Sequence, residues 1–191
     1  MDHALLVVDA VFGIGNGRIL PAGPLRAALR DQLPYADSIV RLGEGPAADS
    51  VVRLAARAGK PVYTAVAKPV DAARLAGRQF LAFAGIGHPD KFFESVRATR
   101  GELVETRAFP DHHPFTEWEI RGLMADARMR HASLITTAKD AARLKALSVS
   151  GLNEMLEILD IEVVFDDPDV PRRIVGAAMA AYGRRKLVER R

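Results

Sequence analysis

The chain of 191 residues contains no cysteine, and aromatic residues make up only 6% of it. Without thiols it can form neither disulfide bonds nor thiolate metal sites, and this composition is typical of a reducing compartment. No apolar run approaches the roughly 20 residues that a membrane-spanning helix requires. The opening Met-Asp-His leads into an apolar segment without a basic region before it, so the pattern of a signal peptide is missing too.

Both common phosphate-loop patterns are also absent. The string G-x-x-x-x-G-K-[ST] occurs nowhere, and the glycine-rich stretch 13–18 has Arg18 where the third glycine of G-x-G-x-x-G belongs. Pro21 and Pro24 prevent a helix from starting directly after it. Two interpretations remain open for this stretch, a loop that contacts phosphate and a tight surface turn.

The overall composition is ordinary for a folded protein, with 49% apolar and 27% charged residues and a net charge of +3. The length suits one domain or two small ones. Basic residues gather near the C-terminus, at Arg184, Arg185, Lys186, Arg190 and Arg191. They either meet phosphate groups or form a solvated helix end that the helix dipole favours. We expect no nucleic-acid binding, because aromatic residues for base stacking are few and not interleaved with these charges.

The first half of the chain alternates strand and helix patterns. We expect strands at 4–9, 38–42 and 61–66, helices at 25–33 and 46–58, and a linker without clear periodicity at 67–78. The apolar run at 4–9 is typical of a central strand buried on both faces. A chain that opens with a central strand indicates that sequence upstream is missing. In that case the strand becomes an exposed apolar edge, through which the protein can self-associate.

The second half is more regular and predicts four strand–helix units. The strands are expected at 79–84, 102–107, 133–137 and 161–165, with helices that begin at Pro89, Thr116, Lys139 and Pro171. Thr116 and Glu119 have the spacing of a capping box. This alternation predicts an α/β fold, a parallel sheet with helices on both faces. Ligands of such folds bind at the carboxyl ends of the strands.

Polar residues follow several of these strands. Asp9 ends the first strand, where a carboxylate can hold Mg²⁺. Asp111 and His112 lie in the loop after the second strand of the second half, where proton transfer or phosphate contact is favoured over metal binding. The alternative is a loop in which Asp111 only caps a turn. The segments 136–140 and 166–169 precede helices, so that capping competes with anion binding at the first and with Mg²⁺ binding at the second.

Taken together, six strings resemble the tetraacyldisaccharide 4'-kinase (lipid A 4'-kinase) family in their order and spacing, over nearly the whole chain. They are Val8-Asp9, Gly15-Asn16-Gly17-Arg18, Leu20-Pro21-Ala22-Gly23-Pro24-Leu25-Arg26, the stretch from Phe83 to Phe93, the stretch from Phe109 to Phe115, and Thr136-Thr137 with Lys139-Asp140.

The resemblance implies a function, a fold and a location. These kinases transfer the γ-phosphate of ATP, with Mg²⁺, to the 4'-hydroxyl of tetraacyldisaccharide 1-phosphate, a lipid A precursor. They are cytoplasmic or work at the cytoplasmic face of the Gram-negative inner membrane, with peripheral association. The implied architecture is a partial P-loop-kinase core (residues 1–66), a hinge (67–78) and a Rossmann-like C-terminal domain (79–191).

The resemblance also implies roles for individual residues. His112, beside Asp111, is the histidine of a catalytic dyad whose aspartate lies in an N-terminal segment. The residues implied in nucleotide or phosphate binding are Asn16, Gly17, Arg18, Arg26, Lys139 and Asp140, and Asp9 is the candidate Mg²⁺ ligand.

Departures from the family pattern limit this interpretation. The P-loop, the acidic D-D-G string before Val8 and the aspartate of the dyad are absent, and Ala27 and Ala138 stand where family members usually have glutamate. A phosphate cradle and its lysine supply much of the transition-state stabilisation. We therefore expect no ATP turnover by this chain alone. Whether the two alanines abolish function stays open, and so does the alternative of a non-catalytic module that binds a nucleotide or an anionic lipid.

Overall fold

The computed structural model describes residues 2–189 and divides the chain into two compact units. Unit 1 comprises Met1–Ala67 together with Val163–Arg191, and unit 2 comprises Lys68–Glu162. The chain passes between the units in two strands, β3 (Val62–Pro69) and β8 (Ile161–Phe165). The expected single domain at 79–191 is therefore divided, because the last helix groups with the N-terminal residues. The expected linker holds the end of β3 and a short helix.

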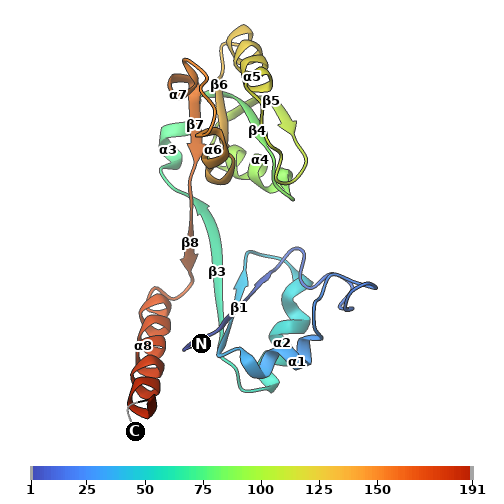
Figure 1. The fold of residues 1–191 in the computed structure, drawn as a ribbon, viewed down its shortest axis with the longest axis vertical. Helices are drawn as coiled ribbons and strands as arrows, with labels where there is room; N and C mark the ends of the chain where they lie inside the picture. The colour runs from blue at the N-terminus through green and yellow to red at the C-terminus, as the bar shows by residue number, and fades with distance from the viewer. Residues whose placement is uncertain (1, 190–191) are drawn as a thin grey trace. The chain divides into compact units, whose positions relative to one another are not determined.

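Unit 1 is built on a four-stranded sheet with the order β1-β2-β3-β8 (Figure 1). Strands β1 (Leu5–Asp9), β2 (Ser38–Leu42) and β3 pair in parallel. Strand β8 lies beside β3 in the opposite direction, because the Asp166 N–H donates to the Thr64 carbonyl whereas the Val70 N–H donates to the Asp160 carbonyl.

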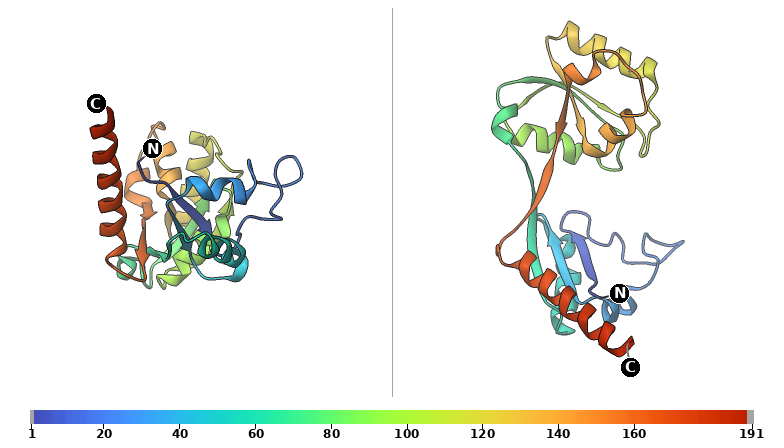
Figure 2. Two further views of the ribbon diagram at one scale, coloured as in Figure 1. Left: turned by 90° about the horizontal axis from the view of Figure 1, so that it is seen from below. Right: turned by 60° about the vertical axis from the view of Figure 1, so that its left-hand side comes forward.

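The helices of unit 1 are short except for the last. They are α1 (Leu29–Gln32), the 3-10 helices η1 (Leu33–Tyr35) and η2 (Pro46–Ala48), α2 (Asp49–Arg57) and α8 (Val170–Glu189). The helix expected at 25–33 is reduced to α1, because residues 10–28 form a long loop, drawn in blue in both views of Figure 2. The prolines of this loop fix the backbone and remove N–H donors, which explains why the helix starts late.

Strand β1 corrects one expectation and confirms another. Val8 packs into a core with Ile39 and Val51, and Leu6 adds to it. Leu5 and Val7 point to the other face and are 42% and 55% exposed, so the strand is not buried on both faces. Because β1 is the first strand of its sheet, it presents the expected exposed apolar edge.

Unit 2 contains a parallel sheet with the order β5-β4-β6-β7. Its strands are β4 (Gln79–Ala84), β5 (Glu102–Ala108), β6 (Ser133–Thr137) and β7 (Leu156–Leu159). The first three agree with the predicted strands. The fourth was expected at 161–165, but that segment is β8 of the other sheet, and β7 takes its place.

Helices cover both faces of this sheet, which confirms the predicted fold class. They are α3 (Ala72–Leu75), α4 (Pro89–Ala98), α5 (Glu117–Met129), α6 (Ala138–Leu144) and α7 (Leu152–Met155). Alternation along β4 separates two cores. Phe80 packs with residues of α4, whereas Leu81 and Phe83 pack with residues of α5 and α6.

The start of α5 shows why sequence signals placed it well. The Thr116 side chain accepts the Glu119 N–H, and the Glu119 side chain accepts the Thr116 N–H at 2.8 Å. This reciprocal pair satisfies two of the N–H groups that a helix start leaves without partners.

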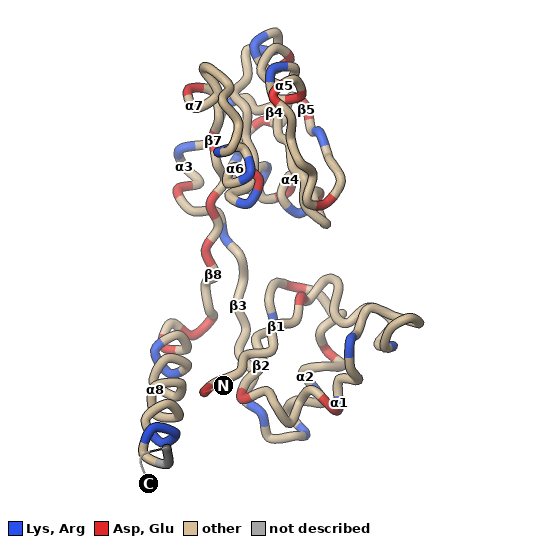
Figure 3. The backbone as a smooth tube through the Cα atoms, viewed as in Figure 1, with Lys and Arg blue, Asp and Glu red and all other residues tan. Residues whose placement is uncertain are grey.

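The C-terminal basic cluster lies on the last turns of α8 (Figure 3). Arg184, Arg185 and Lys186 are exposed there, and Arg190 and Arg191 lie outside the described residues. Between residues 2 and 189, no helix combines the length and the apolar character needed to cross a membrane.

Candidate functional site

The carboxyl ends of β4, β5 and β6 adjoin one another in unit 2, because β4 is paired on one side with β5 and on the other with β6. The chain moves from β4 to β5 and then crosses back to β6. Such a reversal of strand order opens a crevice between the loops, the usual place for a ligand in open α/β sheets. The segments that follow these three strands, whose places Figure 1 shows, contain Gly85 after β4, the Asp111–His113 stretch after β5, and Asp140 in the first turn of α6 after β6.

Asp140 links the start of α6 to the loop after β4. It is fully buried at 0% exposure, and its Oδ2 accepts the Gly85 N–H at 3.0 Å and the Thr137 hydroxyl at 3.0 Å. Thr137 in turn accepts the Asp140 N–H and thereby caps α6. A buried carboxylate needs such partners, because an unpaired charge in the interior is costly. Asp140 therefore acts beneath the surface of the site.

Arg143, which no sequence motif indicated, connects the start of α6 with the loops after β4 and β5. It is one helical turn from Asp140 and donates to its Oδ1 at 2.6 Å, to the Gly85 carbonyl at 2.9 Å and to His112 Nδ1 at 2.9 Å. Its i, i+3 spacing from Asp140 on α6 is the sequence signal by which it could have been found.

His112 stands at the surface of this network. Its side chain is 81% exposed, and its backbone has a φ of 60°, in the left-handed region that few residues other than glycine adopt. The His112 N–H donates to the Gly85 carbonyl at 3.1 Å, which holds this conformation. Asp111 is exposed beside it, with 3.8 Å between its Oδ1 and His112 Nε2. The pair expected to act in proton transfer is thus accessible.

His113, although adjacent, has a structural role. Its ring stacks on Phe109 at 4.8 Å and meets Phe115 edge-on at 5.0 Å. Its Nε2 lies 2.9 Å from Glu119 Oε1, which attaches the loop to the capping box of α5. Hydrogen bonds to Glu119 from the Thr116 backbone, the Thr116 hydroxyl and His113 hold the pKa of the Glu119 carboxyl below its usual value.

The remaining polar residues at the end of β6 and the start of α6 differ in their exposure to solvent. The Thr136 hydroxyl is buried and donates to the Phe83 carbonyl at 2.8 Å, so its role is to hold two strands together. Lys139 is exposed in the first turn of α6. Of the polar side chains expected between 136 and 140, Lys139 is therefore the exposed one.

The glycine-rich loop of unit 1 closes on itself. The Asn16 amide donates to the Ala22 carbonyl at 2.8 Å, and its oxygen accepts the Arg18 N–H at 3.1 Å. A Cβ at Gly23 would lie 2.2 Å from that Asn16 oxygen, so only glycine fits there. Gly17 has a φ of 70°, typical of glycine in a turn.

The two arginines expected to contact nucleotide both lie in this loop. The side chains of Arg18 and Arg26 are exposed to solvent. The backbone of Arg18 is held by the Leu25 N–H, which donates to its carbonyl at 3.1 Å. Asn16, Gly17, Arg18 and Arg26 therefore lie in one loop of unit 1.

Asp9 ends β1, as predicted, and turns the chain into this loop. Its Oδ1 accepts the N–H groups of Val11 at 2.8 Å and Phe12 at 3.1 Å. Among residues 2–189, no group of three or more histidine or acidic side chains is arranged to hold a metal ion.

The acidic stretch before α8 caps that helix. Asp167 accepts the Asp169 N–H at 2.9 Å and pairs with Arg173. These two interactions hold the pKa of the Asp167 carboxyl below its usual value. Capping, one of the two interpretations given for 166–169, describes this geometry.

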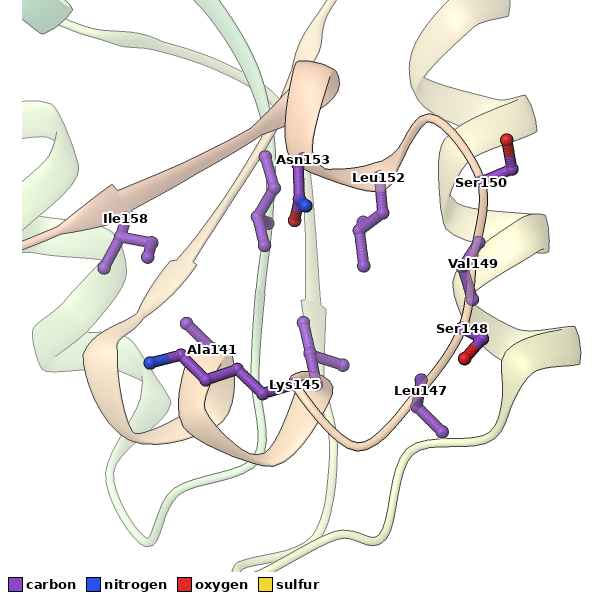
Figure 4. A pocket seen from close by; sticks show the side chains of 11 residues that line it. Ala141, Lys145, Leu147, Ser148, Val149, Ser150, Leu152, Asn153 and Ile158 are labelled. Carbon is purple, nitrogen blue, oxygen red and sulfur yellow. The ribbon is translucent and has the colours of Figure 1, made fainter.

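Unit 2 also has an open hollow of about 560 Å³ (Figure 4). It lies between α6, the following loop and β7, with an apolar floor that includes Leu144 and Ile158 and with Lys145 and Asn153 at its margin. None of the candidate site residues lines it.

The fold and the site define an α/β protein with a ligand edge in unit 2, where a histidine, an aspartate and basic side chains suit phosphate chemistry. The chain is more particularly related to one group of enzymes. The family model of tetraacyldisaccharide-1-P 4'-kinases (LpxK) matches residues 1–179, and the chain belongs to this family.

Named relatives agree with the family match. The chain is 52% identical over 187 residues to a tetraacyldisaccharide 4'-kinase of Mesorhizobium japonicum, which covers 98% of this chain and 55% of that protein. It is 49% identical over 192 residues to that of Rhizobium meliloti, which covers 100% of this chain and 56% of that protein. The chain thus spans about half the length of the curated relatives it matches.

A solved structure has the same fold. It is the crystal structure of an "apo" form of LpxK from Aquifex aeolicus in complex with ATP, with a TM-score of 0.57 and 20% sequence identity. The match covers 93% of this chain and 52% of that one. The resemblance stated from the sequence motifs is therefore confirmed at the level of family and fold.

Proposed function

We propose that this chain carries the histidine-bearing half of an ATP-dependent tetraacyldisaccharide 4'-kinase and that, without a phosphate-binding P-loop, it does not transfer phosphate alone. The observation that carries the proposal is the family match over residues 1–179, combined with an accessible His112 at the ligand edge of unit 2. Phosphoryl transfer depends mainly on positioning and charge neutralisation, which these side chains are suited to supply.

The proposed roles follow from the exposure of each side chain to solvent. His112, assisted by Asp111, acts on the reacting hydroxyl together with an aspartate from another segment. The exposed Arg18, Arg26 and Lys139 contact phosphate groups of ATP or of the lipid. Asn16 and Gly17 shape the loop that presents Arg18.

Asp140 and Asp9 have supporting roles in this proposal. Asp140 is buried and engaged by three groups, so we assign it to holding Arg143 and Gly85 instead of touching the nucleotide. Asp9 would supply one carboxylate to Mg²⁺, whose charge would neutralise that of the phosphates.

The proposed substrate is the lipid A disaccharide precursor, which lies in a membrane. We therefore place the working protein in the cytoplasm or at the cytoplasmic face of the inner membrane, in peripheral association. The exposed Arg184, Arg185 and Lys186 at the end of α8 are compatible with anionic headgroups. We also propose that the apolar edge at Leu5 and Val7 allows the isolated chain to self-associate.

A chimera tests this function. The aligned region of the Mesorhizobium japonicum relative would be replaced by this chain, and transfer of labelled phosphate from ATP to tetraacyldisaccharide 1-phosphate would be measured. We expect the chimera to phosphorylate the lipid and the isolated chain to be inactive. In the chimera, His112→Ala should lower the rate by about 10²–10⁴-fold, the range for general acid–base groups.

The matched control is Arg121→Ala, at an exposed position of α5 outside the site. It should leave the rate within about twofold. A chimera that folds, as judged by cooperative melting, but transfers no phosphate would contradict the proposal and would indicate that Ala27 or Ala138 is incompatible with activity. Transfer by the isolated chain would contradict its second part.

The alternative is a non-catalytic module that binds a nucleotide or an anionic lipid. The absence of the P-loop string from the sequence favours it over an independent enzyme. Calorimetric binding of ATP or of the lipid by the isolated chain, together with an inactive chimera, would support this alternative.

A further inference from the structure

Arg143 holds three groups at the ligand edge of unit 2. One nitrogen of its guanidinium donates to the Gly85 carbonyl and to Asp140 Oδ1, and the other donates to His112 Nδ1 at 2.9 Å. Its side chain is 26% exposed, and so is partly withdrawn from water. These contacts fix the plane of the guanidinium.

The contact with His112 determines the tautomer of the imidazole. Arginine only donates hydrogen bonds, and it stays protonated at any ordinary pH. His112 Nδ1 must therefore be the acceptor. A neutral imidazole has one N–H and one unprotonated nitrogen, so the hydrogen of His112 resides on Nε2.

The position of His112 is fixed as well as its tautomer. Its backbone N–H donates to the same Gly85 carbonyl that accepts from Arg143. Its left-handed backbone costs about 1 kcal/mol for a residue other than glycine, so the contacts around it must offset that cost. Arg143 is itself held by Asp140, whose other oxygen is engaged by Gly85 and Thr137.

The His112 side chain that carries Nε2 is 81% exposed. Asp111 Oδ1 is 3.8 Å away, which is longer than a hydrogen bond. The Nε2–H is therefore available to an oxygen that enters from solvent.

We propose that Arg143 is a positioning residue that fixes His112 as the Nε2–H tautomer, so that His112 acts as a hydrogen-bond donor toward an anionic oxygen. That oxygen belongs to a carboxylate or a phosphate. In the proposed kinase this donor would stabilise charge on that oxygen. The mechanistic consequence rests on the proposed kinase function, whereas the tautomer does not.

Histidine-selective ¹⁵N labelling of the whole chain tests the proposal without ATP or lipid. Long-range ¹H–¹⁵N spectra would be recorded at pH 8.5, above the ordinary imidazole pKa of about 6.5. The His112 signals would be assigned with His112→Gln. We expect Nδ1 in the acceptor range, Nε2 protonated, and, with arginine also labelled, a coupling across the hydrogen bond to Arg143.

Variants show whether Arg143 is the cause. In Arg143→Met the coupling should disappear and a fraction of the Nδ1–H tautomer should become detectable, while Arg121→Met should change nothing. The His113 signals report folding of the same loop, because this ring packs on Phe109. If Arg143→Met disturbs them, Arg143→Lys, which retains a donor, is expected to keep the Nε2–H tautomer in a folded chain.

Two results would overturn the proposal. One is an Nδ1–H tautomer for His112 in the unaltered chain, which would mean that the contact with Arg143 is absent in solution. The other is an unchanged His112 spectrum in folded Arg143→Met. Neither depends on the kinase assay, so an inactive chimera with the expected spectra would reject the function and leave the tautomer inference standing.

Discussion

The carboxylate of Asp140 accepts the backbone N–H of Gly85 at 3.0 Å, although 55 residues separate them in the sequence. This one bond connects the loop after β4 to the start of α6. Because the same carboxylate pairs with Arg143, it also supports the position of His112. The site of unit 2 is thus organised from a buried charge outward to an exposed imidazole.

Removing this carboxylate should destabilise unit 2. In Asp140→Ala, the Gly85 N–H and the partly buried Arg143 lose their partner, and breaking such a pair costs about 3 kcal/mol. Urea unfolding followed by circular dichroism measures the change. Asp160→Ala, at an exposed aspartate of the same unit, should stay within about 0.5 kcal/mol. Equal effects of the two substitutions would show that burial of Asp140 is not important.

Two glycines of unit 2 should respond in opposite directions to alanine. A Cβ at Gly85 would lie 3.1 Å from the His113 Cβ and 3.3 Å from the Pro110 carbonyl oxygen, so Gly85→Ala should cost about 1–3 kcal/mol through overpacking. A Cβ at Gly122, within α5, would meet open space, and Gly122→Ala should stabilise by about 0.5–1 kcal/mol. Thermal melting compares the two variants. A gain in stability for Gly85→Ala would show that the His113 Cβ and the Pro110 carbonyl oxygen do not crowd this position.

Loss of the capping box of α5 should lower the free energy of unfolding by less than Asp140→Ala does. Thr116→Ala removes the hydroxyl that accepts the Glu119 N–H and should lower the free energy of unfolding by about 1 kcal/mol. Thr116→Ser retains that hydroxyl and serves as the control in the same urea titration. If serine destabilises as much as alanine, the effect comes from the threonine methyl group and not from the cap.

Stability should also depend on pH through Glu119. Its pKa is lowered below 4.5 in the folded chain, first by the Thr116 backbone N–H, with further contributions from the Thr116 hydroxyl and His113. A lowered folded pKa stabilises the protein above the unfolded value and loses that effect as the pH falls through the folded value. The difference between the parent and Glu119→Gln should therefore be full at pH 7 and shrink below about pH 4.5. A constant difference between pH 7 and pH 3 in urea unfolding would contradict this linkage.

Local signals explain which features could be predicted from the sequence. Strand β4, with its continuous apolar run, and the Thr116 cap depend on neighbouring residues, and the structure has both where they were expected. The end of unit 2 was missed because β7 and β8 are separated by Asp160 alone, and which sheet each strand joins depends on distant partners.

The same distinction applies to the site. His112 could be selected from its motif, since a histidine beside an aspartate at a strand end has recognisable chemistry. Arg143 could not be selected in this way, because its role exists only when the segments that follow β4, β5 and β6 meet. The different roles of His112 and His113 are likewise a matter of packing, as one ring is exposed and the other lies against Phe109.

The exposed edge of unit 1 leads to a prediction about assembly. Strand β1 has backbone groups without a neighbouring strand on one side in the described sheet, and it presents Leu5 and Val7 beside them. Such edges pair with other chains, and a lysine on the edge opposes pairing through its charge. The average mass of the chain in analytical ultracentrifugation should therefore rise with concentration, and Val7→Lys should keep it monomeric. Val175→Lys, which removes an exposed apolar side chain of α8 and no strand edge, should associate like the parent. A parent chain that remains monomeric at high concentration would show that the edge at β1 is protected in solution.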